Sequence, residues 1–444
     1  MEEIISAIAT ANGVGGVAII RVSGNGALEL ASKMFKPLSK NIQVNNFEPY
    51  KMYVGEIDGG TFTDFGMAVY FKAPKSYTGE DMVEFHCHGG LAISRGILKR
   101  TFELGAVPAT RGEFTKRAFI NGKLSLDGAE GLISMINGES IASVKAGYNL
   151  YREKLNAKIL ELQNDLTYSL ASIDADIDYP EEDLQATAIS DVESALNKTL
   201  TTVNDLIKKY DGGAKIKNGV KVAIVGKPNT GKSSILNMLL NYDKAIVSSI
   251  AGTTRDVVEG SLEINGINFY FYDTAGIREA SDEIEKIGIE KSSKILKSAD
   301  IALVVFDGSN MESEDEAILN EVTSAEIIKV YNKLDISNKE YKNALNISAK
   351  TGEGLEELKQ KLFDSAFKEG IDLNGEFITE ERHFNALNKA KRYIEEALSN
   401  LNLVPLDLVA EDVKMVWDSL GEITGKTASE EIIDEIFKKF CVGK

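Results

Sequence analysis

Residues 226–233, which read Gly-Lys-Pro-Asn-Thr-Gly-Lys-Ser, fit the pattern G-x-x-x-x-G-K-[ST] and constrain this chain more than any other segment. Residues 220–225 have the alternating pattern and the β-branched side chains of a buried strand, and residues 233–240 are good helix formers. In such a strand-loop-helix unit, backbone N–H groups near the glycines and at the helix N-terminus face phosphate oxygens. Lys232 then reaches the β and γ phosphates, and Ser233 offers a hydroxyl to Mg²⁺. The segment therefore predicts an α/β domain that binds a nucleoside triphosphate.

Two later patterns extend this site and indicate the base. Residues 268–272 read as a strand ending in Asp273-Thr274-Ala275-Gly276, where the acid can hold the Mg²⁺ shell and the glycine can approach the γ phosphate. A second strand, residues 327–331, ends in Asn332-Lys333-Leu334-Asp335, and Ser348-Ala349-Lys350 follows later; both resemble the guanine-reading loops of Ras-like GTPases. The Asp335 carboxylate can accept from guanine N1–H and the 2-amino group, a donor pair that adenine lacks. We therefore expect GTP.

The residue that orients water in Ras-type enzymes is missing, because the position after the Asp-x-x-Gly pattern is Ile277. Two nearby segments remain candidates for organising hydrolysis: residues 248–256 and the acidic stretch of residues 278–285. Thr254 can complete the Mg²⁺ coordination when the γ phosphate is present. The small residues before it can fold their carbonyls around a second cation.

Composition sets the frame for the rest of the chain. A length of 444 residues suggests about three domains. The formal net charge of −18 argues against broad electrostatic attraction to nucleic acid, so any RNA contact is expected to be local or assisted by a partner. The sequence holds no apolar run of about eighteen residues, and it starts with acidic rather than basic residues. We expect a cytoplasmic protein without a membrane span, whose two cysteines, Cys87 and Cys441, are thiols.

Helical periodicity flanks the nucleotide-binding segment on both sides. Apolar residues recur every three or four positions over residues 141–173, which predicts one long helix ended by Tyr179-Pro180. A second stripe, residues 192–206, is expected to end at Asp211-Gly212-Gly213, and further stripes cover residues 384–401, 409–420 and 432–440. One helical bundle built from both sides of the chain fits better than a coiled-coil dimer, because the second half lacks sustained heptads.

The N-terminal part alternates strand and helix patterns and predicts an α+β domain. Its His86-Cys87-His88 is not interpreted as a metal site, because neighbouring residues on a strand face opposite sides. The expected fold class is therefore multidomain α/β and α+β, with a Ras-like GTPase domain inserted in a helical bundle. The expected boundaries are 1–118 for the α+β domain, 119–215 and 371–444 for the discontinuous helical domain, and 216–370 for the GTPase domain.

Nearly the whole chain closely resembles the tRNA modification GTPase MnmE (TrmE) family. The marks are Gly-Thr-Thr-Arg-Asp at 252–256, Asp-Thr-Ala-Gly-Ile-Arg-Glu-Ala-Ser-Asp at 273–282 and the final Phe-Cys-Val-Gly-Lys at 440–444. The resemblance implies a GTPase that is activated by K⁺ and whose GTPase domains pair across their nucleotide faces. It implies K⁺ ligands at Asn229, Ser248, Ile250 and Thr253, and Glu285 as the acid that positions the attacking water. The expected GTP and Mg²⁺ contacts, including Ser233 and Thr254 for Mg²⁺, are Asn229, Thr230, Gly231, Lys232, Ser233, Ser234, Ser248, Ser249, Ile250, Ala251, Gly252, Thr253, Thr254, Asp273, Thr274, Ala275, Gly276, Asn332, Lys333, Asp335, Ser348, Ala349 and Lys350.

The same resemblance implies a tetrahydrofolate derivative in the N-terminal domain, with contacts from Arg21, Glu84, Lys123 and Lys444 and with Cys441 beside the site. A pterin edge rich in donors needs a carboxylate, and a glutamate tail needs cations. The implied function is addition of a C5 substituent to wobble uridine 34 of certain tRNAs. A homodimer would carry it out with a flavin-dependent partner of the MnmG family. The alternative is a ribosome-assembly GTPase switch, which the folate-like domain and the lack of a basic RNA-binding module after residue 370 disfavour.

Overall fold

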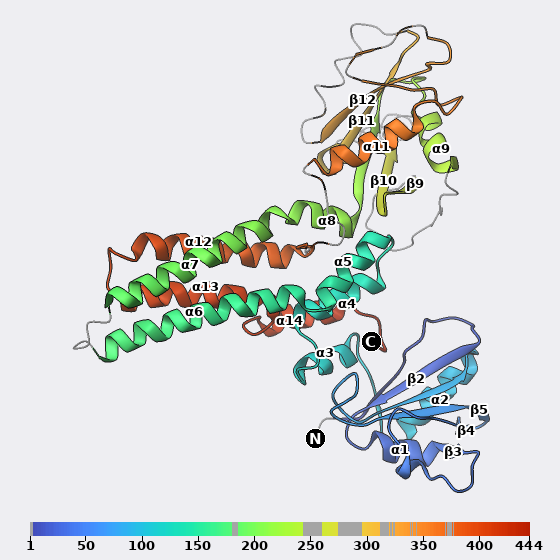
Figure 1. The fold of residues 1–444 in the computed structure, drawn as a ribbon. Coiled ribbons are helices and arrows are strands. Elements are labelled where there is room, and N and C mark those ends of the chain that lie inside the picture. Colours follow the sequence, from blue (N-terminus) through green and yellow to red (C-terminus); the bar gives the residue numbers. More distant parts are fainter. Residues whose placement is uncertain are drawn as a thin grey trace, which may run out of the picture. The chain divides into compact units, whose positions relative to one another are not determined.

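A computed structural model of the chain describes residues 3–179, 185–242, 260–273, 295–310, 319, 322, 325–337, 339, 341–342, 344–368, 370, 375 and 377–444 (Figure 1). The chain divides into two compact units, each assembled from separate stretches. The first unit contains Met1–Ile133, Leu150–Asn197 and Arg392–Lys444. The second unit contains Ser134–Asn149 and Lys198–Lys391.

In the described part of the first unit, a seven-stranded sheet has the order β3-β4-β5-β6-β2-β1-β7. All its pairs are antiparallel except β1 with β7. The α1 and α2 helices pack on one face of the sheet, because the inward residues of β2, β5 and β6 share a single apolar core with both helices. The elements are β1 (Ile5–Ile8), β2 (Val17–Ser23), α1 (Ala27–Met34), β3 (Phe35–Pro37), a 3₁₀ turn (Val44–Asn46), β4 (Met52–Asp58), β5 (Thr63–Phe71), β6 (Met82–His88), α2 (Leu91–Glu103) and β7 (Val107–Pro108). The predicted α+β domain is confirmed.

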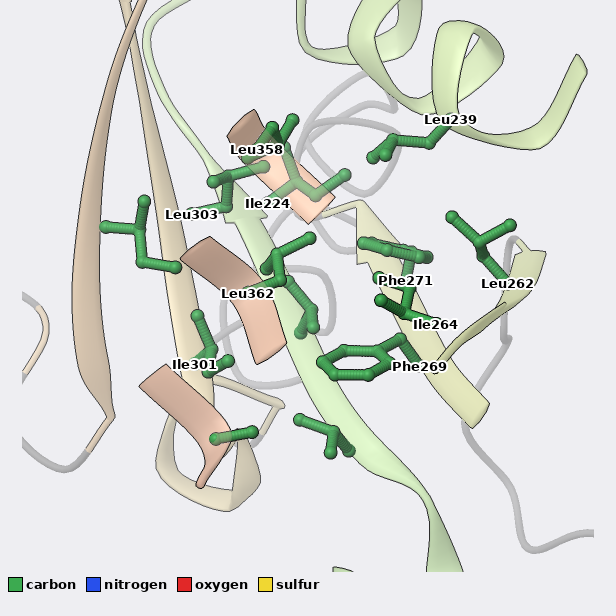
Figure 2. Packing of buried hydrophobic residues seen from close by; sticks show 14 of the residues in the cluster. Ile224, Leu239, Leu262, Ile264, Phe269, Phe271, Ile301, Leu303, Leu358 and Leu362 are labelled. Carbon is green, nitrogen blue, oxygen red and sulfur yellow. The ribbon is translucent and has the colours of Figure 1, made fainter. Parts of the chain in front are cut away.

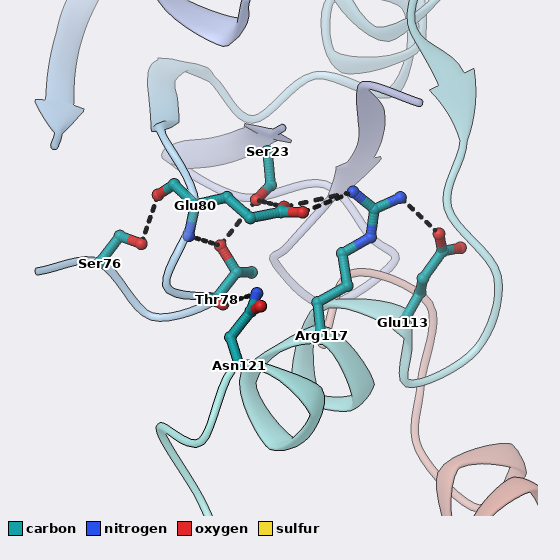
Figure 3. Close-up of polar contacts among 7 residues, drawn as sticks. All are labelled: Ser23, Ser76, Thr78, Glu80, Glu113, Arg117 and Asn121. Carbon is teal, nitrogen blue, oxygen red and sulfur yellow. Dashed lines mark hydrogen bonds and ion pairs between the residues drawn. The ribbon is translucent and has the colours of Figure 1, made fainter. Parts of the chain in front are cut away.

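A network of charged and hydroxyl groups joins this sheet to helix α3 (Glu113–Ile120), as Figure 3 shows. The Arg117 guanidinium donates to Glu80 at 3.0 Å and to Glu113 at 3.0 Å. Ser23 on β2 donates to the same Glu80 carboxylate at 2.7 Å. The Arg117 and Glu80 side chains are each only 11% exposed, so this ion pair lies where water screens it weakly.

The predicted long helix over residues 141–173 is wrong at one point. Helix α4 (Leu126–Ile136) is followed by α5 (Ile141–Tyr151) and α6 (Lys154–Asp178), with a break at Glu153, which has a left-handed φ of 57°. The Glu153 carboxylate accepts a hydrogen bond from the Ser125 backbone at 2.9 Å, which holds the break. The helical period continues across the break, so periodicity alone could not reveal it. The end of α6 before Tyr179-Pro180 is as predicted.

The predicted stop at Gly212-Gly213 is also wrong. Helix α7 (Gln185–Lys208) ends earlier, and α8 (Tyr210–Asn218) runs through both glycines. A Cβ added at Gly213 would lie 2.3 Å from the Ile378 carbonyl oxygen. The glycine therefore serves a close approach of two backbones rather than a helix end.

The three predicted C-terminal helices are confirmed as α12 (Glu381–Asn400), α13 (Leu406–Thr424) and α14 (Glu430–Lys438). In the first unit α13 packs along α6, and Gln163 of α6 donates to the Trp417 carbonyl at 3.0 Å. After α14 the chain returns to the N-terminal sheet. Val442 forms a bridge with Arg111, and Gly443 lies so close to β1 that an added Cβ would be 2.2 Å from the Ile8 carbonyl oxygen.

The described part of the second unit contains a six-stranded sheet of order β13-β12-β11-β8-β10-β9. Its pairs are parallel except β9 with β10, and side chains from β8 to β11 meet those of α9 and α11 in one apolar core (Figure 2). The elements are β8 (Val220–Val225), α9 (Lys232–Tyr242), β9 (Gly260–Ile264), β10 (Ile267–Asp273), β11 (Ile301–Asp307), β12 (Glu326–Asn332), β13 (Leu345–Asn346) and α11 (Leu355–Ala366). The parallel order brings the carboxyl ends of β8, β10, β11 and β12 to one edge. None of the helices in the described ranges combines the length and apolarity needed to cross a membrane.

Replacing Arg117 by Leu is expected to destabilise the N-terminal domain by about 3 kcal/mol, because two largely buried carboxylates lose their shared cation. Burial raises the Glu113 pKa, but bonds from Thr110 and Arg117 outweigh it and hold the pKa below its ordinary value. A lowered folded pKa adds stability above the unfolded pKa, and this gain is lost as pH falls through the folded pKa. The difference in unfolding free energy between the wild type and the Arg117→Leu variant should therefore become smaller at acidic pH.

The measurement is thiol labelling in urea in a Cys441→Ser background, where Cys87 reports on the sheet. Cys87 is 3% exposed, and burial together with the Asp64 charge raises its pKa to about 11, so it reacts only after the domain opens. The control is Lys116→Leu on the same helix, which removes an ion pair between exposed side chains and should shift the labelling midpoint less. Equal shifts for both variants would contradict the role given to Arg117.

Candidate nucleotide and one-carbon sites

The phosphate loop follows β8 and leads directly into α9, as predicted. Its glycines are required by close contacts. A Cβ at Gly226 would lie 2.4 Å from the Val305 carbonyl oxygen, and one at Gly231 would lie 2.1 Å from the Asn332 amide nitrogen. Asn229, between them, has a left-handed φ of 66° and an exposed side chain. The phosphate loop, which continues from β8, therefore packs closely against the ends of β11 and β12.

Lys232 is held over this loop. Its side chain is buried, and its ammonium donates to the carbonyls of Gly226 at 3.0 Å and Lys227 at 2.9 Å. These bonds place the cation where the β and γ phosphates of a nucleotide bind in phosphate-loop proteins.

The donor set of a Mg²⁺ site stands beside it. Asp273 ends β10, which pairs in parallel with β8 so that Asp273 lies opposite Ile224. The Ser233 hydroxyl, in the first turn of α9, donates to the Asp273 carboxylate at 3.4 Å. A hydroxyl and a carboxylate oxygen are the hard ligands that Mg²⁺ uses together with phosphate and water. The predicted ligand Thr254 lies outside the described residues.

Asn332 joins the phosphate loop to the base-reading loop. Its amide donates to the Thr230 carbonyl at 3.0 Å and accepts from the Ala349 backbone at 3.0 Å. Asp335 accepts from the Ser348 hydroxyl at 2.8 Å, and the Lys350 ammonium lies 4.0 Å from its other oxygen. The structure therefore brings the predicted Asn332, Asp335, Ser348, Ala349 and Lys350 together.

Asp307 is a residue of this site that the sequence analysis missed. The Lys333 ammonium donates to its carboxylate, and Lys333 itself has a left-handed φ of 72°. Burial raises the Asp307 pKa, but Lys333 and Ser309 outweigh it and hold the pKa below its ordinary value. The signal was present, because Asp307-Gly308 ends the apolar run of residues 301–306, as Asp273 ends β10.

Several predicted residues lie outside the described part of the chain, so their roles stay predictions. They supply most of the expected K⁺ ligands, the expected second Mg²⁺ ligand and the hydrolytic acid. They are Ser248, Ser249, Ile250, Ala251, Gly252, Thr253, Thr254, Thr274, Ala275, Gly276 and Glu285.

In the first unit, Arg21 and Glu84 form a pair on adjacent strands. The Arg21 guanidinium donates to Glu84 at 2.8 Å and to the Gly443 carbonyl at 3.3 Å. The guanidinium carbon also lies 5.5 Å from the ring centres of both Tyr77 and Phe114. Burial raises the Glu84 pKa, but His86 and Arg21 outweigh it and hold the pKa below its ordinary value. The carboxylate is therefore charged at neutral pH and accepts hydrogen bonds only.

The other predicted one-carbon contacts come from the segment that follows α3 and from the C-terminal residues. Lys123 is exposed and lies against Gly79, whose added Cβ would be 3.3 Å from the lysine Cγ. Cys441 is exposed, and its carbonyl accepts from the backbones of Gly112 and Lys444, each at 3.4 Å. Gly443 near the C-terminus thus contacts Arg21, whereas Lys123 lies against the loop before β6.

Comparisons with known proteins match nearly the whole length of the chain. A family model described as the GTP-binding protein TrmE N-terminus matches residues 4–123, and one described as the MnmE helical domain matches residues 126–441. The chain is 39% identical to a protein named tRNA modification GTPase MnmE from Natranaerobius thermophilus, over the whole of both chains. It is 39% identical to the protein of that name from Fervidobacterium nodosum, over all of this chain and 98% of that one, and 38% identical to the one from Clostridioides difficile, over the whole of both.

Two solved structures are similar to parts of this chain. The G domain of the T. maritima FeoB iron transporter is 30% identical, over 33% of this chain and 98% of that one, with a TM-score of 0.27. Aquifex aeolicus Era bound to GDP·AlF₄⁻ is 29% identical, over 39% of this chain and 66% of that one, with a TM-score of 0.28. Both TM-scores are low, so the assignment of the chain to a family rests on the family models and the full-length relatives.

Replacing Asp335 by Asn should weaken GTP binding roughly 10- to 100-fold, because hydrogen bonds to a charged acceptor are lost. Binding of xanthosine triphosphate should strengthen, since its C2 carbonyl can accept from the new amide. Titration with fluorescent nucleotides measures both constants. Glu353→Gln, which removes an exposed carboxylate near the same loop, is the matched control. Unchanged GTP affinity in the Asp335 variant would show that this residue does not read the base.

Proposed function

The chain belongs to the MnmE family of tRNA modification GTPases, and we propose that it supports addition of a C5 substituent to uridine 34 of certain tRNAs. The substituent is of the carboxymethylaminomethyl or aminomethyl type. One observation carries the proposal: a single chain combines a guanine-type nucleotide site with the Arg21–Glu84 pair, which the C-terminal residues complete. A GTPase that acts only by changing a binding surface between two states would not need the site around Arg21 and Glu84.

The Arg21–Glu84 pair supports a tetrahydrofolate derivative as the one-carbon source. Arg21 fixes Glu84, whose charged oxygens suit the N–H and amino donors of a pterin. Lys123 and Lys444 carry the cations that a glutamate tail would need, and Cys441 stands exposed beside Gly443. The folate group, when bound, supplies the one-carbon unit. The residues named above would bind the folate and hold its orientation.

The open face of the N-terminal sheet supports a homodimer. Met52 and Val54 on β4, Phe65 on β5 and Val17 on β2 are between 44% and 58% exposed. Cross-strand partners share a face, and the register Met52–Val69–Glu84–Arg21 places this apolar surface beside the Arg21 pair. An apolar surface of this kind favours burial against a second copy, which the mass of the protein in solution would reveal. A flavin-dependent protein of the MnmG family is the proposed partner, and the cytoplasm the proposed location.

The proposed hydrolysis uses K⁺ in addition to Mg²⁺. Asn229 stands exposed on the phosphate loop, where its amide oxygen and nearby carbonyls can replace the water shell of a K⁺ ion. Ser248, Ile250 and Thr253 are the other proposed ligands, and Glu285 is proposed to position the attacking water. The added cation would offset charge on the transferring phosphoryl group, as an arginine does in other GTPases.

Replacing K⁺ by Na⁺ at constant ionic strength should slow GTP hydrolysis on the order of tenfold or more, given what a supplied cation is worth in related reactions. Steady-state phosphate release measures the rate, and fluorescent-nucleotide binding, expected to be unchanged, is the control. Equal rates in the two salts would remove K⁺ from the proposal. The role of Glu285 fails separately if Glu285→Ala hydrolyses GTP at the wild-type rate.

Deleting the gene should remove C5-substituted uridines from position 34, and the intact gene should restore them, as nucleoside mass spectrometry would show. The Glu84→Gln variant is expected to bind GTP normally but to bind a reduced folate more weakly and to restore little of the modification. Unchanged levels of C5-substituted uridines in the deletion strain, together with accumulated ribosome precursors, would instead favour a ribosome-assembly switch. If Glu84→Gln restores the modification as fully as the wild-type gene does, the proposed folate site is contradicted and the rest of the proposal is unaffected.

A further inference from the structure

A helix that precedes the nucleotide-binding segment in sequence completes that segment's core. The α5 backbone at Ala142 donates to the Gly266 carbonyl at 3.0 Å, in the turn between β9 and β10. Ala142 and Ala146 are 3% and 7% exposed and belong to the same apolar cluster as Ile264 and Phe269, which Figure 2 labels. The hairpin of β9 and β10 therefore rests on α5.

One tyrosine extends this contact along β10. The Tyr270 hydroxyl donates to the Glu139 carboxylate at 2.7 Å, and its ring packs against Gly219, where an added Cβ would be 2.3 Å from ring carbon Cε2. Gly219 joins α8 to β8. Burial and the neighbouring Glu139 raise the Tyr270 pKa to about 12, so the hydroxyl keeps its proton at neutral pH and donates it. Tyr270 thus ties β10 both to the turn before α5 and to the start of β8.

The position of Glu139 is fixed by the start of α5. The Ser140 and Ser143 side chains each accept from the other residue's backbone N–H at 3.2 Å, and both residues are buried. Such a reciprocal cap fixes the first turn of a helix. Glu139, immediately before the cap, therefore belongs to a rigid turn.

The other end of β10 is the Mg²⁺ site. Tyr270 and Asp273 are three residues apart, about 10 Å along a strand. Between them β10 pairs with β8, placing Tyr270 opposite Lys221 and Asp273 opposite Ile224. Close-packed interiors transmit strain, so a displacement of β10 at Tyr270 is passed along the strand to Asp273, which accepts a hydrogen bond from Ser233 at 3.4 Å.

We propose that Glu139 and Tyr270 are positioning residues for GTP hydrolysis. Through them, α5 sets the placement of β10 and hence of Asp273, and the docking of α5 on the hairpin is linked to the nucleotide state. Because such linkage is reciprocal, a bound nucleotide that favours one placement of Asp273 also changes how firmly α5 docks. These two positioning roles rest on the GTPase activity and do not depend on the proposed tRNA or folate chemistry.

Tyr270→Phe removes the hydroxyl and leaves the packing against Gly219. It should lower kcat about fivefold or more, the usual lower range of such couplings, and raise the Mg²⁺ concentration needed for half-maximal activity. The KM for GTP should change little. Glu139→Ala should have the same effect, the double variant should be no worse than either single one, and Glu139→Gln, which keeps an acceptor, should recover most of the rate. Glu263→Gln, an exposed carboxylate on β9, is the control for lost charge.

Hydrogen exchange at the Ala142 amide tests the linkage without measuring activity. In the wild type its exchange rate should differ about fivefold or more between the GDP form and the form with a non-hydrolysable GTP analogue, and Tyr270→Phe should abolish that difference. Equal exchange in the two wild-type forms would overturn the linkage. Wild-type kcat and Mg²⁺ dependence in Tyr270→Phe, with or without a lower melting temperature, would overturn the positioning role and leave a contact that only stabilises the fold.

Discussion

The nucleotide site depends on the side-chain amide of Asn332. This one group donates to the phosphate loop at Thr230 and accepts from the base-reading loop at Ala349, so it fixes the distance between the two ends of a bound nucleotide. It is 3% exposed, where water competes little for these bonds. Gly231 leaves room for the amide, since a Cβ there would overlap its nitrogen. Lys232 and Asp335 can each act on a nucleotide only because this contact sets their loops at the right separation.

The two chain segments that enter and leave the nucleotide-binding domain are pinned to each other. Gly213 of α8 touches the Ile378 backbone, the Lys217 ammonium donates to Glu380 at 2.6 Å, and the rings of Tyr210 and Phe384 stack at 4.2 Å. An inserted domain whose ends meet can be carried by a helical framework without disturbing it. The pinning also explains why α8 continues through two glycines, which a reading of the sequence alone treats as a stop.

The sequence predicts most strongly what local chemistry determines. The phosphate loop, the strand before it and Asp273 follow from short patterns whose residues act within one loop, and all lie where expected. The break at Glu153 could not be predicted, because its cause is a bond to Ser125, far away in sequence. Asp307 carries a sequence signal, because it ends an apolar run, but its role depends on Lys333, which β12 brings beside it. Tyr270 fits an ordinary strand position in the sequence, and its role depends on Glu139, which lies in the turn before α5.

The contact between Arg21 and Gly443 has a consequence for biosynthesis. The two residues are 422 positions apart, so the ribosome makes β2 long before the residue that closes the site. At about 5–20 residues per second the delay is roughly 20 to 80 seconds. During that time the N-terminal sheet can fold, yet Arg21 lacks its bond to the Gly443 carbonyl. A chain released before Gly443 is made would therefore carry an assembled sheet without this contact.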